Sequence, residues 1–437
     1  MVSEPASPPN QPSRTEANHS WLRSLRPLAG RRLPARLSAK HVHRLVDPLV
    51  EGVADPAFAT LLGQIDGRAP YGGNEVEVFF RGEEAFAAMR RAIEAARDEV
   101  LLESYIFTDD ATGRGVVAAL VEARQRGVVV RVVVDAVGSA ATREEFWREM
   151  GRAGIEVRRF HPLRPDFLRH PFRDHRKILV VDREVAFTGG MNIADEYGSA
   201  RPRHGEPWRD SHVQAKGPVA HELALVFAES WHLSRSFRRG SRLVLSPFVE
   251  PHGAAGTRVM VLDSRPNRGH AESAAVFAAL VAGARRSLFI TNAYFAPKRI
   301  AAQVLGRAAA RGVDVRLLLP GRTDVPLVRH AGHGFFTGLL EQGVRIFEYQ
   351  RSVLHAKCLV ADGLVSMVGS TNLDFRSFTF NGECNLVVFE PELGGRMEQA
   401  FLADVADAEE VELRTWRHRP LPHRLGDALA RGLAPLL

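Results

Sequence analysis

Short apolar runs alternate with longer stretches of mixed polarity along this chain of 437 residues. The run VVVRVVVD (128–135) is too short and too rich in β-branched residues for a helix. Such a run is typical of a strand that is covered on both faces. The stretches on either side predict helices. Together they predict an α/β fold.

This pattern occurs twice. Each copy predicts a helix, a buried strand, a second helix, an Arg-Gly-Val turn and a second buried strand, followed by a third strand ahead of a histidine motif. The repeated unit has the size of a domain rather than of a solenoid repeat. The matching segments are AIEAARDEVLLESYIF (92–107) with ALVAGARRSLFITNAYF (279–295), 116–139 with 301–320, and GIEVRRF (154–160) with GVRIFEY (343–349).

We therefore expect two similar α/β domains, each a mixed sheet flanked by helices. The ends of the chain are different. The first residues are polar and rich in Pro and Ser, without the apolar core of a secretory signal, and are expected to be disordered. The predicted divisions are a disordered and basic N-terminal arm with a lead-in (1–70), a first domain (71–245), a Pro- and Gly-rich linker (246–257), a second domain (258–413) and a basic amphipathic tail (414–437).

Composition adds constraints on partners and compartment. The formal net charge of +7 favours anionic partners, either a phospholipid surface or nucleic acid, unless the arginine excess is only a compositional habit. Cys358 and Cys384 are the only cysteines, too few for a disulfide framework, and they fit a reducing compartment as buried, inert thiols. No stretch approaches the roughly 18 consecutive apolar residues of a membrane span.

Lysine is rare in this arginine-rich chain, yet two of its five lysines have the same neighbours, in HRKILVVD (175–182) and HAKCLVAD (355–362). Random placement gives such a His-Lys-Asp spacing on the order of 0.01 times per chain. His175 and Lys177, like His355 and Lys357, are two positions apart in a predicted strand and share one face. The motif therefore marks a duplicated site.

The acidic ends of the two motifs have two readings. Asp182 and Asp362 complete the motif and belong to the candidate catalytic set. Each also begins a predicted hairpin turn, where aspartate commonly serves local backbone hydrogen bonds. We expect a turn centred between 362 and 363.

That turn predicts which residues face the histidines. Ser370 is expected opposite His355, with Asn372 beyond it on the same face. The corresponding set in the first copy is Gly190, His175 and Asn192. Each hairpin thus gathers His, Lys and Asn, with a serine only in the second copy.

These residue types suit phosphoryl chemistry. An ammonium group and a carboxamide can bind phosphate oxygens and offset the charge of a pentacoordinate transition state. Imidazole acts as nucleophile or as proton donor, and two copies supply both roles. No Cys/His or carboxylate cluster with metal-ligand spacing is evident, so neither a metal nor a cofactor is expected.

Two other kinds of residue are weaker candidates. Tyr105 and Tyr294 lie at equivalent strand ends, where active-site loops begin in α/β sheets, although packing is the simpler role. The histidines that can line the cleft, or equally lie on the surface or in the core, are His161, His170, His330 and His333.

Paired HxKxxxxD motifs followed by GGMN and GSTN resemble the phospholipase D superfamily, and LLESYIFTDD, WRDSHVQAKGP and GSTNLDFRSFTFNGE resemble its bacterial cardiolipin synthase branch. The resemblance covers residues 76–413. It implies two phospholipase D-like domains related by pseudo-twofold symmetry, with the active site between them.

The resemblance also implies roles for individual residues. His175 would form a covalent phosphohistidine and His355 would be the general acid. A carboxylate would orient each histidine, and Glu383 and Asp210 occupy the matching positions. Gly190 departs from the small hydroxyl residue common in the family, which would leave the first-half phosphate contacts one donor short.

The expected function is cardiolipin synthesis, with phosphatidylglycerol and the membrane surface as partners and no nucleic acid. Terminal segments that mix Trp, Leu and Arg (21–46 and 414–437) are typical of interfacial contact, while an ordinary solvated arm explains the first of them equally well. Since no membrane span is evident, any attachment is expected to be peripheral, at the cytoplasmic side. The alternatives are a hydrolytic phospholipase D, a nuclease or other phosphodiesterase, and a pseudoenzyme that only docks on membranes. The oligomeric state stays open.

Overall fold

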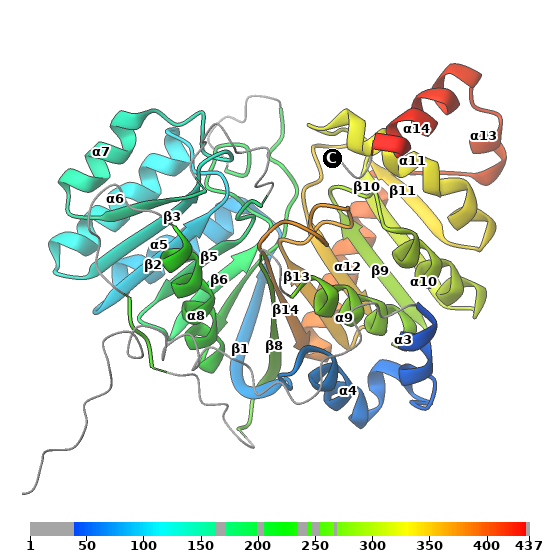
Figure 1. Ribbon diagram of the computed structural model, residues 1–437, viewed down its shortest axis with the longest axis horizontal. Helices are drawn as coiled ribbons and strands as arrows, with labels where there is room; N and C mark the ends of the chain where they lie inside the picture. Colours follow the sequence, from blue (N-terminus) through cyan, green and yellow to red (C-terminus); the bar gives the residue numbers. More distant parts are fainter. Residues whose placement is uncertain are drawn as a thin grey trace, which may run out of the picture.

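The computed structural model describes residues 39–161, 172–198, 205–234, 243–246, 254–265 and 269–433. His170, most of the predicted linker and the first part of the basic arm lie outside these residues. Within them the strands form one 15-stranded sheet. At its centre β1 (Tyr71–Phe79) pairs antiparallel with β8 (Thr257–Ser264), which joins the two halves of the chain edge to edge (Figure 1).

The two halves repeat one strand order outward from this central pair. The corresponding strands hold the same positions, which gives the expected pseudo-twofold arrangement. In each half the three repeated strands farthest from the centre are parallel to one another, and the strands nearer the centre are antiparallel to their neighbours. The first half runs β1, β7 (His212–Lys216), β6 (Val185–Gly189), β5 (Lys177–Val181), β2 (Glu99–Ser104), β3 (Val129–Asp135), β4 (Glu156–Phe160). The second runs β8, β14 (Glu383–Phe389), β13 (Val365–Gly369), β12 (Lys357–Ala361), β9 (Ser287–Asn292), β10 (Asp314–Pro320), β11 (Arg345–Tyr349), with β15 (Ala408–Glu410) added at the edge.

Helices cover both faces of each half, because alternate residues of the buried strands pack in opposite directions. Leu102 faces the helices on one side of the first half and Leu101 faces the helix on the other. The first half has α5 (Gly82–Ala95), α6 (Ala111–Gln125) and α7 (Glu144–Arg152) on one face and α8 (Pro218–Leu233) on the other. The second half has α9 (His270–Gly283), α10 (Arg299–Ala310) and α11 (Pro326–Glu341) opposite α12 (Pro391–Ala406). This confirms the predicted fold class.

The lead-in to the first domain belongs in space to the second half. Helices α3 (Ala39–Val46) and α4 (Pro56–Asp66), with the short helix η1 (Gly52–Ala54), pack on the second-half core. Val42, Val46 and Phe58 are all buried there. The lead-in part of residues 1–70 is thus folded from residue 39 onward, since these apolar side chains complete the cover over α9.

After α12 the chain adds two further helices, α13 (Leu413–Arg417) and α14 (Leu421–Leu433), which stand at one corner of the molecule beside α11 (Figure 1). In the part of the chain that the structure describes, no helix combines the length and apolarity needed to cross a membrane. The boundaries predicted for the domains stay a prediction, since the sheet continues from one half into the other.

The hairpin of each motif is one residue longer in its turn than predicted. Cys358 pairs with Val368 and Ala361 with Val365, so the loop contains residues 362–364 rather than a two-residue turn. Asp362 adopts a left-handed conformation with φ of 56°, and Gly363 follows at 68°. The register shifts by one position, and Ser370 does not lie directly opposite His355.

Candidate active site

Both histidine motifs reach the same edge of the sheet. Lys177 at the start of β5 pairs with Ser104 at the end of β2, and Lys357 at the start of β12 pairs with Asn292 at the end of β9. His175 and His355 precede these strands. Both imidazoles are buried, with 7% and 4% of each residue exposed. The symmetry of the sheet thus brings two copies of the motif to one place between the halves.

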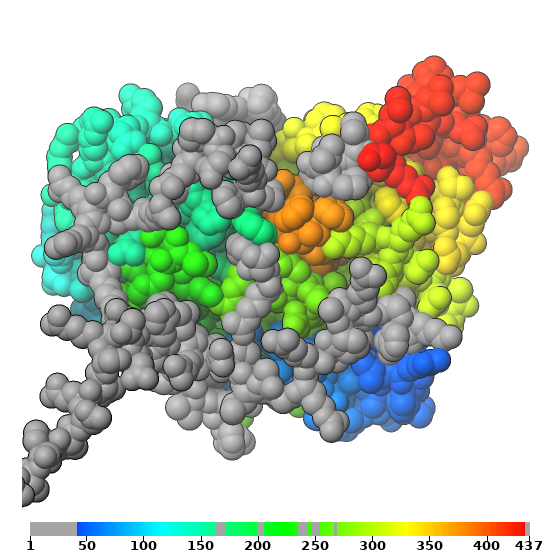
Figure 2. Space-filling view, viewed as in Figure 1, coloured from blue at the N-terminus to red at the C-terminus, as the bar shows by residue number. Residues whose placement is uncertain are grey.

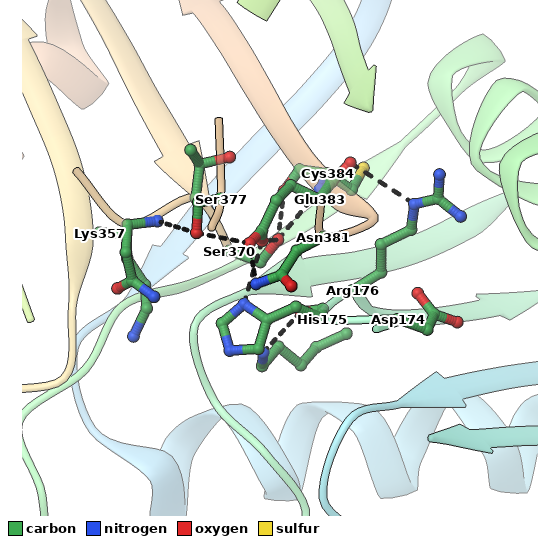
Figure 3. Close-up of polar contacts among 12 residues, drawn as sticks. Asp174, His175, Arg176, Lys357, Ser370, Ser377, Asn381, Glu383 and Cys384 are labelled. Carbon is green, nitrogen blue, oxygen red and sulfur yellow. Dashed lines mark hydrogen bonds and ion pairs between the residues drawn. The ribbon is translucent and has the colours of Figure 1, made fainter. Parts of the chain in front are cut away.

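His175 is held by a carboxylate of the opposite half. Its Nδ1 lies 3.0 Å from Oε2 of Glu383, the first residue of β14 (Figure 3). Three further donors hold Glu383: the hydroxyl of Ser370 at 2.5 Å, that of Ser377 at 2.7 Å and the amide of Asn381 at 3.4 Å. Burial acts to raise the pKa of Glu383, but the charge and hydrogen bond of His175 outweigh it and the pKa is lowered. Glu383 is therefore an ionised acceptor for the imidazole.

His355 has the reciprocal arrangement. Its Nδ1 lies 2.7 Å from Oδ2 of Asp210, which belongs to the first half, and 3.1 Å from the hydroxyl of Tyr197. Asp210 is fully buried and accepts a hydrogen bond from the backbone N–H of Ser211 at 2.7 Å. Burial raises the pKa of Asp210 to about 6, against the opposing charge of Lys357.

The two histidine–carboxylate pairs are therefore crossed between the halves. With Nδ1 bound to a carboxylate, Nε2 is the ring atom left for substrate in each imidazole. The position of each carboxylate, and which histidine it serves, depend on strands that are far apart in sequence. Neither half contains a complete pair.

Gly190 proves to be small for a structural reason. A Cβ atom there would lie 2.1 Å from Oδ1 of Asp210. In the second half the equivalent space holds the Ser370 hydroxyl, which donates to Glu383. The hydroxyl of Ser370 thus supports a carboxylate, and the expectation that the first-half phosphate contacts are one donor short stays a prediction.

The two motif lysines bring positive charge into the buried site. Nζ of Lys177 donates to the carbonyl oxygen of His175 at 2.6 Å, and Nζ of Lys357 donates to that of His355 and lies 2.8 Å from its Nδ1. Burial lowers the pKa of Lys177 to about 7, with Glu383 opposing. Burial also lowers the pKa of Lys357 to about 8, with Asp210 opposing. An anionic group is the ligand that such a site favours.

The same surroundings act on the imidazoles. Burial lowers the pKa of His175, although the charge of Glu383 partly restores it. The pKa of His355 falls further, because the charges of Lys357 and Lys177 add to the effect of burial. Without substrate these surroundings therefore disfavour the protonated form of both rings, and that of His355 more strongly.

Aromatic rings wall the site on both sides. Tyr105 packs edge-on against His175 at 4.9 Å between ring centroids, and Tyr294 packs edge-on against His355 at 5.8 Å. The Trp208 ring lies 5.5 Å from His355. Tyr197 and Trp208 were not among the predicted site residues. The signal for Trp208 is its place two residues before Asp210, whereas nothing in the sequence marks Tyr197.

The two motif asparagines differ in their engagement. Nδ2 of Asn192 donates to the Tyr197 hydroxyl at 3.0 Å, and its Oδ1 accepts from the backbone of Ile106 at 3.2 Å. Asn192 therefore positions Tyr197 instead of being free for substrate. The side-chain oxygen of Asn372 is buried and has no partner among the described residues, so it is the better candidate to meet a ligand.

Asp182 and Asp362 lie away from the imidazoles, at the far ends of β5 and β12. The five-residue strands separate them from the motif lysines by about 16 Å. Asp362 accepts from three consecutive backbone N–H groups, those of residues 285, 286 and 287, at 2.8–2.9 Å. Asp182 does the same for residues 97–99. The catalytic role predicted for both is corrected to a structural one.

A different cluster has the composition of a metal site. His330 and His333 on α11 and Asp427 on α14 place one potential ligand atom each within 4.8 Å of one another. Both Nδ1 atoms face the same oxygen of Asp427, at 2.8 and 3.3 Å, and Arg419 contacts the other oxygen at 2.8 Å. This group lies outside the paired-histidine site. Cys358 and Cys384 are buried free thiols, as predicted.

Comparison with known proteins agrees with this geometry. Residues 89–200 and 277–405 match the family described as "Cardiolipin synthase, PLD-like domain", one segment in each half. The chain belongs to the cardiolipin synthase family. Membership makes it an enzyme of the phosphatidyltransferase class.

Curated members of the family align over most of their length. A cardiolipin synthase of Geobacillus sp. (strain WCH70) is 33% identical over 377 residues, covering 85% of this chain and 74% of that protein. One from Listeria monocytogenes serotype 4b (strain CLIP80459) is 31% identical over 393 residues, covering 90% and 81%.

Solved structures share the fold at low identity. The crystal structure of phosphatidylserine synthase from Haemophilus influenzae Rd KW20 matches 86% of this chain and 97% of that one, with a TM-score of 0.66 and 13% identity. Polyphosphate kinase from Porphyromonas gingivalis matches 92% of this chain and 56% of its own, with a TM-score of 0.52 and 15% identity. The overall fold is therefore shared by proteins with different names.

Proposed function

We propose that this family member is a cardiolipin synthase that transfers a phosphatidyl group between two phosphatidylglycerol molecules and releases glycerol. The observation that carries the proposal is the crossed site, in which two buried imidazoles each present Nε2 while two lysines supply positive charge. Curated relatives named cardiolipin synthase align with most of this chain.

In the first step Nε2 of neutral His175 attacks the phosphorus of phosphatidylglycerol. The bond from phosphorus to the glycerol oxygen breaks, and protonated His355 gives its proton to that oxygen. The product is a phosphatidyl group bound to His175, and glycerol leaves. Glu383 accepts from Nδ1–H throughout, which stabilises the positive charge that develops on the ring.

In the second step the terminal hydroxyl of another phosphatidylglycerol enters. It gives its proton to neutral His355, and its oxygen attacks phosphorus as the bond to His175 breaks. Cardiolipin leaves, His175 is neutral again and His355 is protonated for the next cycle. Each histidine keeps one role, and no atom is left unaccounted for.

His355 needs a proton before the first step, although burial and two lysines hold its pKa down. The phosphodiester of the substrate carries one negative charge. Between the lysines, that charge offsets the repulsion and raises the pKa of His355. Substrate binding thus raises the pKa of the histidine that acts as general acid.

A hydrolytic phospholipase D would use the same residues with water as the acceptor, giving phosphatidic acid. The burial of both imidazoles supports transfer, since bulk water has little access to the intermediate. We also propose that the enzyme works peripherally at the cytoplasmic face of the membrane, where its lipid substrates lie.

The deciding experiment incubates the purified protein with phosphatidylglycerol vesicles and resolves lipids and glycerol by mass spectrometry. Cardiolipin with an equal amount of glycerol is expected. Phosphatidic acid as the main product identifies a hydrolase instead. Cleavage of DNA without lipid turnover contradicts both, and the His175→Ala variant serves as the inactive control.

A further inference from the structure

Three leucines on α14 are exposed to solvent. Leu421, Leu425 and Leu429 have exposed fractions of 68%, 64% and 73%. Their spacing of four residues places them in one stripe along the helix. Scattered exposed leucines are ordinary, but a continuous stripe on one helix costs solubility and indicates a contact. We call these three residues the leucine stripe.

The opposite side of α14 is fixed to the protein. Asp427 is 3% exposed, and its carboxylate contacts His330, His333 and Arg419. Arg431 donates to the carbonyl oxygen of Gly334 at 3.0 Å. These contacts fix the rotation of the helix about its axis, and the leucine stripe therefore faces the solvent. Figure 2 shows the corner formed by α13 and α14, in red, projecting beyond the rest of that face.

This corner adjoins the active site. Ala430 of α14 is buried in a small apolar cluster against Ala296 and Val328, and the ring of Tyr294 packs on that cluster. Tyr294 is the same residue that packs edge-on against His355. Tyr294 therefore packs both on the cluster that contains Ala430 and on a catalytic imidazole. A surface that docked on the leucine stripe would lie at the rim of the site.

The charge carried by α13 and α14 is mainly positive, although Arg417 is paired with Glu341 of α11. Residues 413–433 contain five arginines and a single acidic residue, Asp427, which is buried. Arg424 on α14 itself is exposed. An exposed apolar stripe beside cationic side chains is the composition of a helix that lies in a bilayer interface.

We propose that α14 is the membrane-docking element of this protein, with the leucine stripe inserted into an anionic phospholipid bilayer at the rim of the active site. The inference rests on the proposed function for its purpose, since a lipid substrate must reach Nε2 of His175 from a membrane. It adds which residues make the contact and how the site is oriented toward the bilayer. A second copy of the chain is a poorer occupant, because the arginines of two facing copies would repel each other.

Binding is measured by sedimentation with vesicles of 70% phosphatidylcholine and 30% phosphatidylglycerol, a composition chosen to be about as anionic as a cytoplasmic leaflet. The triple variant Leu421→Ser/Leu425→Ser/Leu429→Ser is expected to bind at least ~10-fold more weakly than the unchanged protein. The matched control is Val50→Ser/Val244→Ser/Leu402→Ser, which removes three other exposed apolar side chains and should bind normally.

Turnover separates docking from chemistry. On monomeric dihexanoyl phosphatidylglycerol the stripe variant should react at the rate of the unchanged protein, while on vesicles its rate falls with its binding. Unchanged vesicle binding by the stripe variant overturns the inference, as does equal weakening by the control. If the variant instead converts a dimer to a monomer in sedimentation equilibrium while vesicle binding persists, the stripe is a subunit interface. Absence of any lipid turnover would refute the proposed function and leave the binding result standing.

Discussion

The two halves of the site do the same task with different side chains. In the first half a short carboxylate, Asp210, lies where Gly190 leaves space for it. In the second half a longer carboxylate, that of Glu383, accepts a hydrogen bond from the Ser370 hydroxyl. Each carboxylate binds Nδ1 of the histidine in the other half, at 2.7 and 3.0 Å. The two halves therefore reach a similar geometry with different pairs of residues.

This difference shows that the residue beside each carboxylate must be considered together with the length of that carboxylate. Glycine beside aspartate and serine beside glutamate are two solutions to filling one volume. The two carboxyl groups also differ in acidity, since the pKa of Asp210 is raised to about 6 and that of Glu383 is lowered. An ionised Glu383 suits the histidine that becomes positively charged and covalently bound, which supports His175 as the nucleophile.

The largest expected effect separates the two histidines. His175→Ala should lower turnover about 10⁴-fold or more and abolish the acid-labile phosphoenzyme, because the attacking nitrogen is gone. His355→Ala should lower turnover comparably while a phosphoenzyme still forms slowly. Rapid quench with labelled phosphatidylglycerol measures the adduct. An adduct on His355 in the His175→Ala protein would reverse the assignment.

A smaller effect tests the paired volumes. Gly190→Ser places a Cβ against the carboxylate of Asp210 and should lower kcat about 10²-fold, because His355 loses its alignment. Ser370→Gly removes a single hydrogen bond to Glu383 and should cost about 10-fold. Steady-state kinetics on one lipid preparation compares them. Equal losses would contradict the volume argument, and circular dichroism checks that both variants fold.

The pH dependence should show the lysines. The pKa of Lys177 is about 7 and that of Lys357 about 8, so positive charge is lost as pH rises and kcat/KM should fall above about pH 7. In Lys177→Arg the guanidinium stays charged, and whatever activity persists should decline only near pH 8. A profile of kcat/KM from pH 5 to 10 on monomeric lipid measures the alkaline decline in both proteins. If the alkaline limb is the same in both proteins, another group controls it.

The smallest effect on chemistry is expected at the motif aspartates. Asp362→Asn should lower the free energy of unfolding by about 1–3 kcal/mol, since it weakens three backbone hydrogen bonds at a buried site, and kcat should change little. Asp182→Asn should do the same to a lesser degree, because Asp182 is less buried. Urea denaturation and kinetics together decide. A large fall in kcat without loss of stability would return these residues to the catalytic set.

Sequence alone was sufficient for the repeated architecture, because runs such as VVVRVVVD (128–135) can be buried only as strands. It was also sufficient for the meeting of His175 with His355, since a duplicated unit implies a symmetric partner. It failed where one residue decides the geometry. Asp182 and Asp362 adopt positive φ values of 52° and 56°, and the three-residue loops they open shifted the predicted register by one position.

Other features depended on contacts between distant segments. Tyr197 reaches His355 across 158 positions, and His330 reaches Asp427 across 97. No local pattern predicts such pairs. The tail at 414–437 shows the same limit, because its mixture of leucine and arginine predicted interfacial contact but not which leucines face outward. Packing of Ala430 and Asp427 determines that.

The crossed carboxylates also couple activity to the completion of folding. A chain in which only one half has formed contains a histidine whose orienting carboxylate is still elsewhere, so it has no competent nucleophile. By the same logic, two separately expressed halves would each be inert and would regain turnover only on reassociating along β1 and β8, so that catalysis itself reports that the molecule is whole.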